Sequence, residues 1–204
     1  MMARSDDLYR LPEGLPIPAD DGACDHLHGM RWPSLALPST RGGTVDVAAV
    51  EADWQVLYFY PRTGQPDRDP PGGLKQWDAI PGSRGCTPQA CAYRDLHADL
   101  RALGAQVFGV STQDTEYQKE AAERLHLPFP LLSDASLELA RALRLPTFVV
   151  AGQTLVKRLT LVGDRERIER CLYPVFPPDE DAENVLRYLR GRHEHRRSGR
   201  TDPA

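Results

Sequence analysis

The chain has 204 residues, a formal net charge of −4 and 41% hydrophobic residues, the composition of an ordinary globular protein. This mild acidity gives no reason to expect nucleic acid or an anionic membrane as a partner, and no apolar run is long enough to span a membrane. The N-terminus has no apolar segment of the secretory type, and four cysteines are too few for a disulfide scaffold. We therefore expect a cytoplasmic protein with catalytic, metal-binding or buried cysteines.

Composition divides the chain into three regions. Residues 1–40 are rich in Pro, Gly and Asp without periodicity, which predicts an extended N-terminal arm lying on the domain, its first residues disordered. Residues 41–190 predict one folded domain, and residues 191–204 a polar, mobile tail. Within the domain, residues 62–82 are rich in Pro and Gly and predict a long inserted loop.

Hydrophobic patterns along the domain predict alternating strands and helices. We expect a short strand or helix start at 44–50, helices at 87–103, 114–127, 135–143 and 179–189, and strands at 54–60, 106–110, 129–132, 147–150, 154–162 and 168–173. This order predicts an α/β domain with a central mixed β-sheet flanked by helices.

The stretch Ser83-Arg84-Gly85-Cys86 places a cysteine at the start of the first long helix. Unpaired N–H groups and the helix dipole favour the thiolate there, which is the nucleophilic form of cysteine. Gly85 allows close backbone approach, and Arg84 adds a positive charge. The Ser83 hydroxyl can both donate and accept, which suits a peroxide. We interpret Cys86 as a peroxide-attacking thiolate rather than an inert buried cysteine.

A second cysteine, Cys91, follows five residues later and is interpreted as the resolving thiol. On an α-helix, five residues turn through about 500° and rise about 7.5 Å, which separates the two Cα atoms beyond the span of a disulfide. The helix start must therefore unwind before the disulfide forms, and helix ends are places of low stability. Cys171, near the end of the last strand, is either a buried bystander or a rival resolving cysteine.

Several motifs in order resemble the peroxiredoxins, and most of all the peroxiredoxin Q or bacterioferritin comigratory protein group. The resemblance runs from about residue 54 to 173. It rests on LYFYP (57–61), SRGCTPQACAYRD (83–95), LGAQVFGVSTQ (103–113), LPFPLLSD (127–134) and KRLTLV (157–162).

The resemblance implies a thioredoxin-like fold and the reduction of hydrogen peroxide or organic hydroperoxides, with no cofactor or metal. Cys86 would be the peroxidatic cysteine, with Ser83 and Arg158 beside it. Cys91 would resolve the sulfenic acid as an intramolecular disulfide, which thioredoxin or a similar dithiol would reduce. We expect a monomer or a weak homodimer.

Two features depart from the group's pattern. Its active-site proline stands four residues before the Ser or Thr, and Ala79 occupies that position here. Pro61 is expected to keep this role with the insertion looped out, and Pro81 is the alternative. Arg84 stands where the group often has proline, which adds a charge beside the nucleophile.

Three other interpretations stay open on the sequence alone. The LPTF segment (145–148) resembles the proline strand of a thiol–disulfide oxidoreductase, but the chain has no Cys-x-x-Cys. A non-catalytic redox sensor would use the same Cys86–Cys91 switch, and turnover with a dithiol would distinguish it from an enzyme. A zinc site at Cys24, His26 and His28 does not match the usual ligand spacings.

Overall fold

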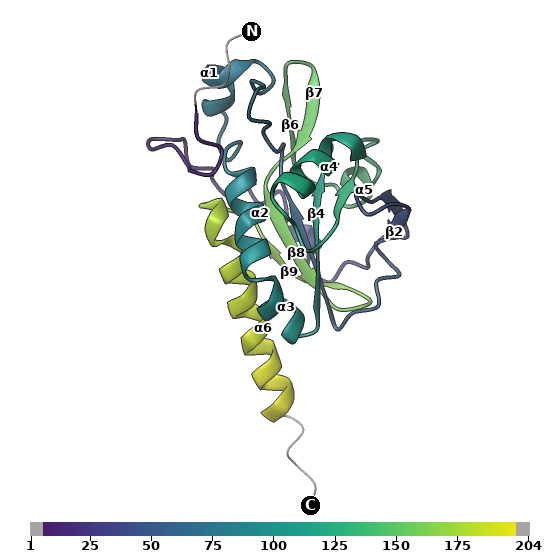
Figure 1. Ribbon diagram of the computed structural model, residues 1–204. Coiled ribbons are helices and arrows are strands. Elements are labelled where there is room, and N and C mark those ends of the chain that lie inside the picture. The colour runs from purple at the N-terminus through teal and green to yellow at the C-terminus, as the bar shows by residue number, and fades with distance from the viewer. Residues whose placement is uncertain (1–5, 199–204) are drawn as a thin grey trace, which may run out of the picture.

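The computed structural model describes residues 6–198 and has a mixed sheet with helices packed along it (Figure 1). The strands are β1 (Ala36–Pro38), β2 (Thr44–Asp46), β3 (Trp54–Phe59), β4 (Ala105–Ser111), β5 (Leu131–Ser133), β6 (Thr147–Val150), β7 (Gln153–Val156), β8 (Leu159–Gly163) and β9 (Ile168–Leu172). The helices are α1 (Gly73–Asp78), α2 (Cys86–Asp95), α3 (His97–Ala102), α4 (Thr115–Arg124), α5 (Glu138–Ala142) and α6 (Asp181–Ser198), with the 3₁₀ helices η1 (Asp25–Leu27) and η2 (Pro178–Glu180). Across the described part of the chain, no helix has the length and apolar character needed to cross a membrane.

The central sheet has five strands in the order β5-β4-β3-β8-β9. Strand β4 runs parallel to β3 and β5, whereas β8 runs antiparallel to β3 and β9. Helices α2 and α3 form the crossover between the parallel strands β3 and β4, as parallel neighbours require. The pairs β1–β2 and β6–β7 form two small separate sheets. The predicted α/β domain with a central mixed sheet is therefore confirmed.

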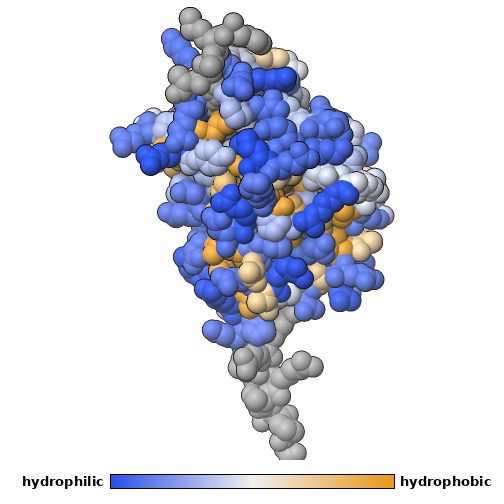
Figure 2. All heavy atoms as spheres, in the orientation of Figure 1, coloured by the Kyte–Doolittle hydropathy of each residue, from blue (hydrophilic) through white to orange (hydrophobic). Residues whose placement is uncertain are grey.

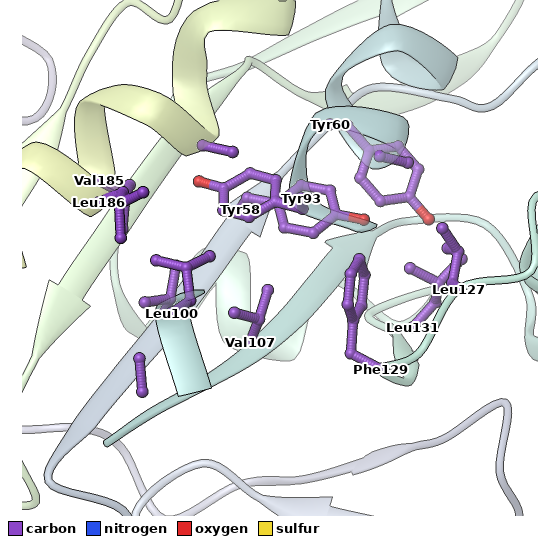
Figure 3. Close-up of a cluster of buried hydrophobic side chains, with 14 of the residues drawn as sticks. Tyr58, Tyr60, Tyr93, Leu100, Val107, Leu127, Phe129, Leu131, Val185 and Leu186 are labelled. Atoms are coloured by element: carbon purple, nitrogen blue, oxygen red, sulfur yellow. The ribbon is translucent and has the colours of Figure 1, made fainter. Parts of the chain in front are cut away.

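Strand β3 is buried on both faces because it lies at the centre of the sheet. Val56 and Tyr58 point into a core shared with α2, α3 and α6, whereas Leu57 and Phe59 point into the core on the opposite face. In the first core, the rings of Tyr58 and Tyr93 stack with their centroids 4.4 Å apart (Figure 3). This packing fixes α2 against the sheet.

The N-terminal arm helps to cover the opposite face of the sheet. Leu27 and Trp32 are buried there beside Leu139 and Leu143 from the α5 region. The indole Nε1 of Trp32 also donates to the Asp164 carbonyl at 2.8 Å, which satisfies its polar end. The arm residues therefore form part of this core.

Two predicted elements are each divided in the structure. The helix expected at 87–103 is interrupted at Leu96, whose backbone (φ −96°, ψ 6°) ends α2 and begins α3. The strand expected at 154–162 is divided between β7 and β8, because β7 pairs with β6 as a hairpin whereas β8 joins the central sheet. Arg158 lies in the break between β7 and β8, not on a strand as expected.

Two segments expected to be irregular contain helix. The 62–82 insertion includes α1, whose Trp77 is buried with Val150 and Leu155. The predicted tail from 191 continues α6 to Ser198, because its Arg, His and Glu side chains are compatible with a helix and no proline interrupts it. Arg192 also pairs with Glu169 at 2.6 Å. The expected disorder at 1–5 and the tail beyond 198 lie outside the described residues.

The face of the molecule shown in Figure 2 is largely hydrophilic, with apolar side chains in small separate areas. This face carries α2, α4 and α6 (Figure 1). Scattered apolar residues of this kind are normal on a protein surface and do not by themselves indicate a docking site.

Candidate active site

Cys86 is the first residue of α2, and its side chain is buried, with 4% of the residue exposed. The preceding Gly85 has φ +92°, a conformation that a residue with a side chain adopts only with strain. A Cβ atom at Gly85 would also lie 2.2 Å from Cγ of Pro178 and 2.7 Å from Cδ1 of Leu11. The close backbone approach expected at Gly85 is therefore used to pack η2 and the N-terminal arm against the start of α2.

The guanidinium group of Arg158 lies against the sulfur of Cys86. Its Nη2 donates to the Cys86 Sγ at 3.1 Å, to the Arg84 carbonyl at 2.9 Å and to the Gly82 carbonyl at 3.3 Å. Arg158 is only 3% exposed, so water does little to screen its charge. A cation in this position, together with the helix start, favours an anionic sulfur.

A buried polar network holds the other side of the guanidinium. Nη1 of Arg158 donates to Oε1 of Gln89, whose Nε2 donates to Oδ2 of Asp181 at 2.8 Å. The same carboxylate oxygen accepts from Thr160 at 2.7 Å and from Tyr93 at 2.9 Å. Burial raises the pKa of Asp181 above its usual value, while these hydrogen bonds act in the opposite direction. The network orients Arg158 through the amide of Gln89.

Ser83, the other polar group expected at the site, is 1% exposed and lines the same cavity as Cys86. Its hydroxyl donates to the Trp77 carbonyl of α1 at 2.6 Å, and the Cys86 thiol approaches the Ser83 carbonyl at 3.7 Å. The donor hydrogen of Ser83 is therefore already used, whereas its oxygen can still accept a hydrogen bond.

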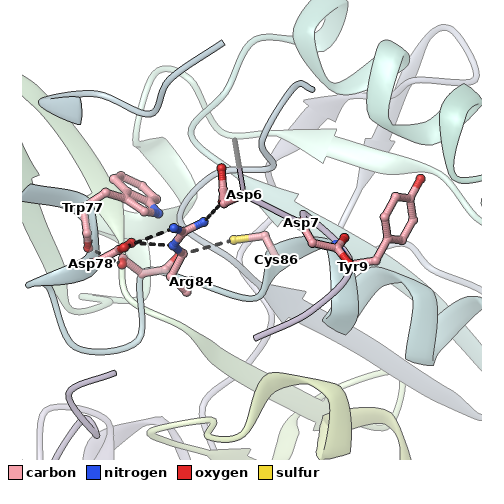
Figure 4. A network of polar contacts seen from close by, with 8 residues as sticks. Asp6, Asp7, Tyr9, Trp77, Asp78, Arg84 and Cys86 are labelled. Atoms are coloured by element: carbon pink, nitrogen blue, oxygen red, sulfur yellow. Dashed lines mark hydrogen bonds and ion pairs between the residues drawn. The ribbon is translucent and has the colours of Figure 1, made fainter. Parts of the chain in front are cut away.

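Arg84 binds the insertion and the arm together. Its guanidinium pairs with Asp78 of α1 and with Asp6 of the arm, beside Cys86 (Figure 4). The second bond to Asp78, from Nη2 to Oδ2, measures 3.1 Å. Arg84 is only 8% exposed, so this charge is neutralised inside the protein rather than directed at the sulfur.

Cys86 opens onto a small cavity of about 30 Å³. One water molecule needs roughly 10–15 Å³, so the cavity has the size of a very small molecule. Three groups of residues bound the cavity. They are the arm residues Asp7, Leu8 and Arg10, insertion residues that include 62–64, Arg68 and Trp77, and Tyr117 of α4. The arm and the insertion therefore form a roof over the sulfur.

Cys91 lies on the same continuous helix as Cys86 and packs, half-buried, against the core that contains Tyr93. Burial raises the pKa of the Cys91 thiol. Both cysteines are free thiols in the structure. Because the helix between them is intact, a disulfide would require unwinding of its first turns, as the sequence argument predicted.

The two candidate prolines lie apart from this cavity. Pro61 is buried directly after β3, and the cavity is lined by the residues that follow it rather than by Pro61 itself. Pro81 is exposed and borders a different pocket, together with Arg158. The active-site role predicted for Pro61, with Pro81 as the alternative, stays a prediction.

The residues proposed for a zinc site are engaged elsewhere. The ring nitrogens of His26 and His28 contact the carbonyls of Leu143 and Glu169, each at 2.9 Å. Within residues 6–198, no group of three or more His, Cys, Asp or Glu side chains is arranged to hold a metal ion.

The network that holds Arg158 was not expected from the sequence. Gln89 lies three residues after Cys86 on α2, so helical spacing places both on the same side of the helix. That spacing was a usable signal for Gln89. Asp181 is far away in the sequence at the start of α6, and no local pattern indicates its contact with α2.

The comparisons with known proteins agree with this fold. The redoxin family model matches residues 27–186. Peroxiredoxin Q of Populus jackii, a chloroplastic protein, is 30% identical over 162 residues, which are 79% of this chain and 67% of that protein. The Triticum aestivum protein is 30% identical, and the alignment covers 77% of this chain but 64% of that protein. The chain thus spans about two thirds of the length of these curated relatives.

Solved structures of similar proteins share this fold. The peroxidoxin BcpB of Mycobacterium tuberculosis has a TM-score of 0.66 at 27% identity, with 80% of this chain and 96% of that chain covered. Peroxiredoxin Q of Xanthomonas campestris shares the fold at 21% identity, with a TM-score of 0.59 and 87% and 97% of the two chains covered. With the family model, these relatives and the arginine-bound cysteine at a helix start, the chain belongs to the redoxin family as a peroxiredoxin of the peroxiredoxin Q type.

Proposed function

We propose that this protein is a thiol peroxidase in which Cys86 reduces a peroxide and Cys91 resolves the product. The observation that carries the proposal is the contact between Nη2 of Arg158 and Sγ of Cys86, 3.1 Å long, at the start of α2 and next to a small cavity. A buried cation beside the sulfur stabilises both the thiolate and a second anion that forms next to it.

The chemistry follows from these positions. The Cys86 thiolate attacks one peroxide oxygen, the O–O bond breaks, and the second oxygen leaves as hydroxide or alkoxide and takes up a proton. Arg158 lies where it can donate to the oxygen as charge develops on it. The Cys91 thiol then attacks the sulfur of the sulfenic acid, and water leaves as the S–S bond forms. Two thiol–disulfide exchanges with a dithiol such as thioredoxin restore both thiols.

The size of the cavity bears on which peroxides reach Cys86. Its 30 Å³ suits hydrogen peroxide, whereas a larger organic hydroperoxide needs the arm or the insertion to move. A Xanthomonas campestris relative of 21% identity is described by its alkyl peroxide reduction activity. We therefore expect both substrate types, with hydrogen peroxide reacting faster.

The test uses reduced protein and one equivalent of hydrogen peroxide, with the cysteines mapped by mass spectrometry over seconds. We expect a Cys86–Cys91 disulfide in the wild type, an unoxidised Cys91 in Cys86→Ser and an accumulated Cys86 sulfenic acid in Cys91→Ser. Cys24→Ser is the matched control and should form the Cys86–Cys91 disulfide as fast as the wild type. If Cys86 reacts no faster than an ordinary thiol, the proposal is wrong.

Turnover separates an enzyme from a redox sensor. With excess peroxide and a thioredoxin system, an enzyme consumes many equivalents of peroxide per protein molecule, whereas a sensor consumes one. Amide hydrogen exchange over residues 87–96 tests the local unwinding, because exchange that is equally slow in the reduced and disulfide forms would contradict it. The physiological dithiol, the oligomeric state and the cytoplasmic location stay predictions.

A further inference from the structure

Cys24 and Cys171, which the proposed mechanism does not use, lie side by side on the opposite face of the sheet from Cys91. Cys24 directly precedes η1 and is 5% exposed, and Cys171 is in β9, half-buried. Both pack into the core that contains Leu27, and the interaction with Cys171 is the largest cause that raises the pKa of the Cys24 thiol. Both are free thiols in the structure.

Hydrogen bonds on either side of the pair hold the arm along β9. Gly29 N donates to the Ile168 carbonyl and Ile168 N donates to the Met30 carbonyl, both at 2.8 Å. Beyond the cysteines, the Tyr173 hydroxyl donates to the Asp21 carboxylate at 2.9 Å. Backbone hydrogen bonds on one side and a side-chain hydrogen bond on the other therefore hold the arm segment with Cys24 along the strand with Cys171.

The two thiols differ in their access to solvent. Cys171 borders a surface groove of about 220 Å³, whose other walls include Arg170, Val175 and Asn184. Cys24 is buried behind it. The interaction with Cys171, followed by burial, raises the pKa of Cys24, which favours the protonated form of this buried thiol. In this arrangement, an oxidant can reach the accessible Cys171 thiol, and the buried Cys24 thiol can then attack the oxidised sulfur to form a disulfide.

We propose that Cys24 and Cys171 form a second redox-active site, which a peroxide closes to a disulfide that fastens the N-terminal arm to β9. The Cys171 thiolate attacks a peroxide oxygen, the O–O bond breaks and, after protonation, water leaves, which gives a sulfenic acid on Cys171. The Cys24 thiol then attacks that sulfur, the S–S bond forms and a second water leaves. A dithiol reverses the reaction by two exchanges.

The disulfide closes a loop that includes most of the folded domain. Linking residues this far apart in sequence restricts the unfolded chain strongly, which raises the stability of the fold. The same arm supplies Asp7, Leu8 and Arg10 to the roof over Cys86. Oxidation at this second site therefore secures part of the roof of the first, but the proposal does not depend on the function proposed for Cys86.

The test uses the Cys86→Ser/Cys91→Ser variant, whose remaining cysteines are Cys24 and Cys171. After treatment of the folded, reduced variant with hydrogen peroxide or diamide, we expect a Cys24–Cys171 linked peptide by mass spectrometry. We also expect a rise of roughly 5–15 °C in the thermal midpoint, reversed by dithiothreitol. The control with Cys171→Ser added should show neither change.

Two outcomes would overturn the proposal. One is that both thiols stay free in the folded variant while they react once it is unfolded in guanidinium. The other is that Cys171 accumulates sulfinic acid while Cys24 stays free, which would show that the two sulfurs cannot approach. If the double variant does not fold, the same mapping on the wild-type protein decides the question.

Discussion

Replacement of Arg158 by methionine tests the contact on which the proposed chemistry rests. Arg158→Met keeps a long unbranched side chain but removes the donor 3.1 Å from the Cys86 sulfur. Hydrogen bonds to charged groups contribute about 1.5–3 kcal/mol each. If this bond stabilises the transition state by that amount, the rate constant for sulfenic acid formation should fall by about 10- to 150-fold. Because Arg158 is 3% exposed, solvent screening does not reduce this figure much.

The assay is stopped-flow fluorescence of the reduced protein mixed with hydrogen peroxide, because Trp77 lines the cavity at Cys86 and serves as a reporter. Arg170→Met is the matched control, since it removes an exposed arginine from β9 and should leave the rate unchanged. Circular dichroism checks that both variants are folded. A folded Arg158→Met protein that reacts within twofold of the wild-type rate would refute the reasoning.

Three further outcomes can be checked with simple variants and reagents. Gly85→Ala should lower the free energy of unfolding in urea by at least about 1–3 kcal/mol, because φ there is +92°, whereas Gly191→Ala, on an open face of α6, should raise it by about 0.5–1 kcal/mol. The hydrogen bond from Lys157 lowers the pKa of Asp21 to about 2, so its stabilising effect is present above pH 4 and is lost as the pH falls to 2. Acid titrations of wild type and Asp21→Asn should therefore converge near pH 2, and an unchanged gap would contradict this assignment. Burial raises the pKa of Cys91, so iodoacetamide should alkylate it more slowly in the folded Cys86→Ser variant than in the same variant unfolded in urea.

The sheet and the place of Cys86 at a helix start could be predicted because their signals are local. The aromatic run at β3 and the Gly85-Cys86 step at a helix start are visible within a few residues of sequence. Arg158 could be paired with Cys86 only through the family resemblance, because the two residues are distant in the sequence. Its place in the break between β7 and β8 depends on two different pairing partners, which the continuous apolar pattern does not reveal.

Most of the structural features that could not be predicted from the sequence are polar contacts between residues far apart in the chain. Asp181 reaches Gln89 only because α6 packs across α2, and Asp6 reaches Arg84 only because the arm folds back over the insertion. Each is an ordinary charged or polar residue in its local context. The helix α1 was also missed, since prolines and glycines around it suggest a loop while burial of Trp77 stabilises it.

In the proposed mechanism, the start of α2 is held in place for peroxide attack and then released for disulfide formation. Arg84 is paired to the arm and to α1, while Arg158 contacts both the Arg84 carbonyl and the Cys86 sulfur. These contacts make the first turn more stable than an ordinary helix end. Helix fraying alone is therefore not sufficient for the second step.

Oxidation of Cys86 itself favours unwinding of the start of α2. In the proposed mechanism, Cys86 changes from a thiolate to a neutral sulfenic acid, and its bond with Arg158 changes from a charged one of about 1.5–3 kcal/mol to a neutral one of about 0.5–1.5 kcal/mol. The loss of about 1–1.5 kcal/mol shifts the opening equilibrium of the helix start roughly 5- to 13-fold towards the unwound form. In this mechanism, the contact between Arg158 and Cys86 makes opening of the helix start depend on oxidation of the sulfur.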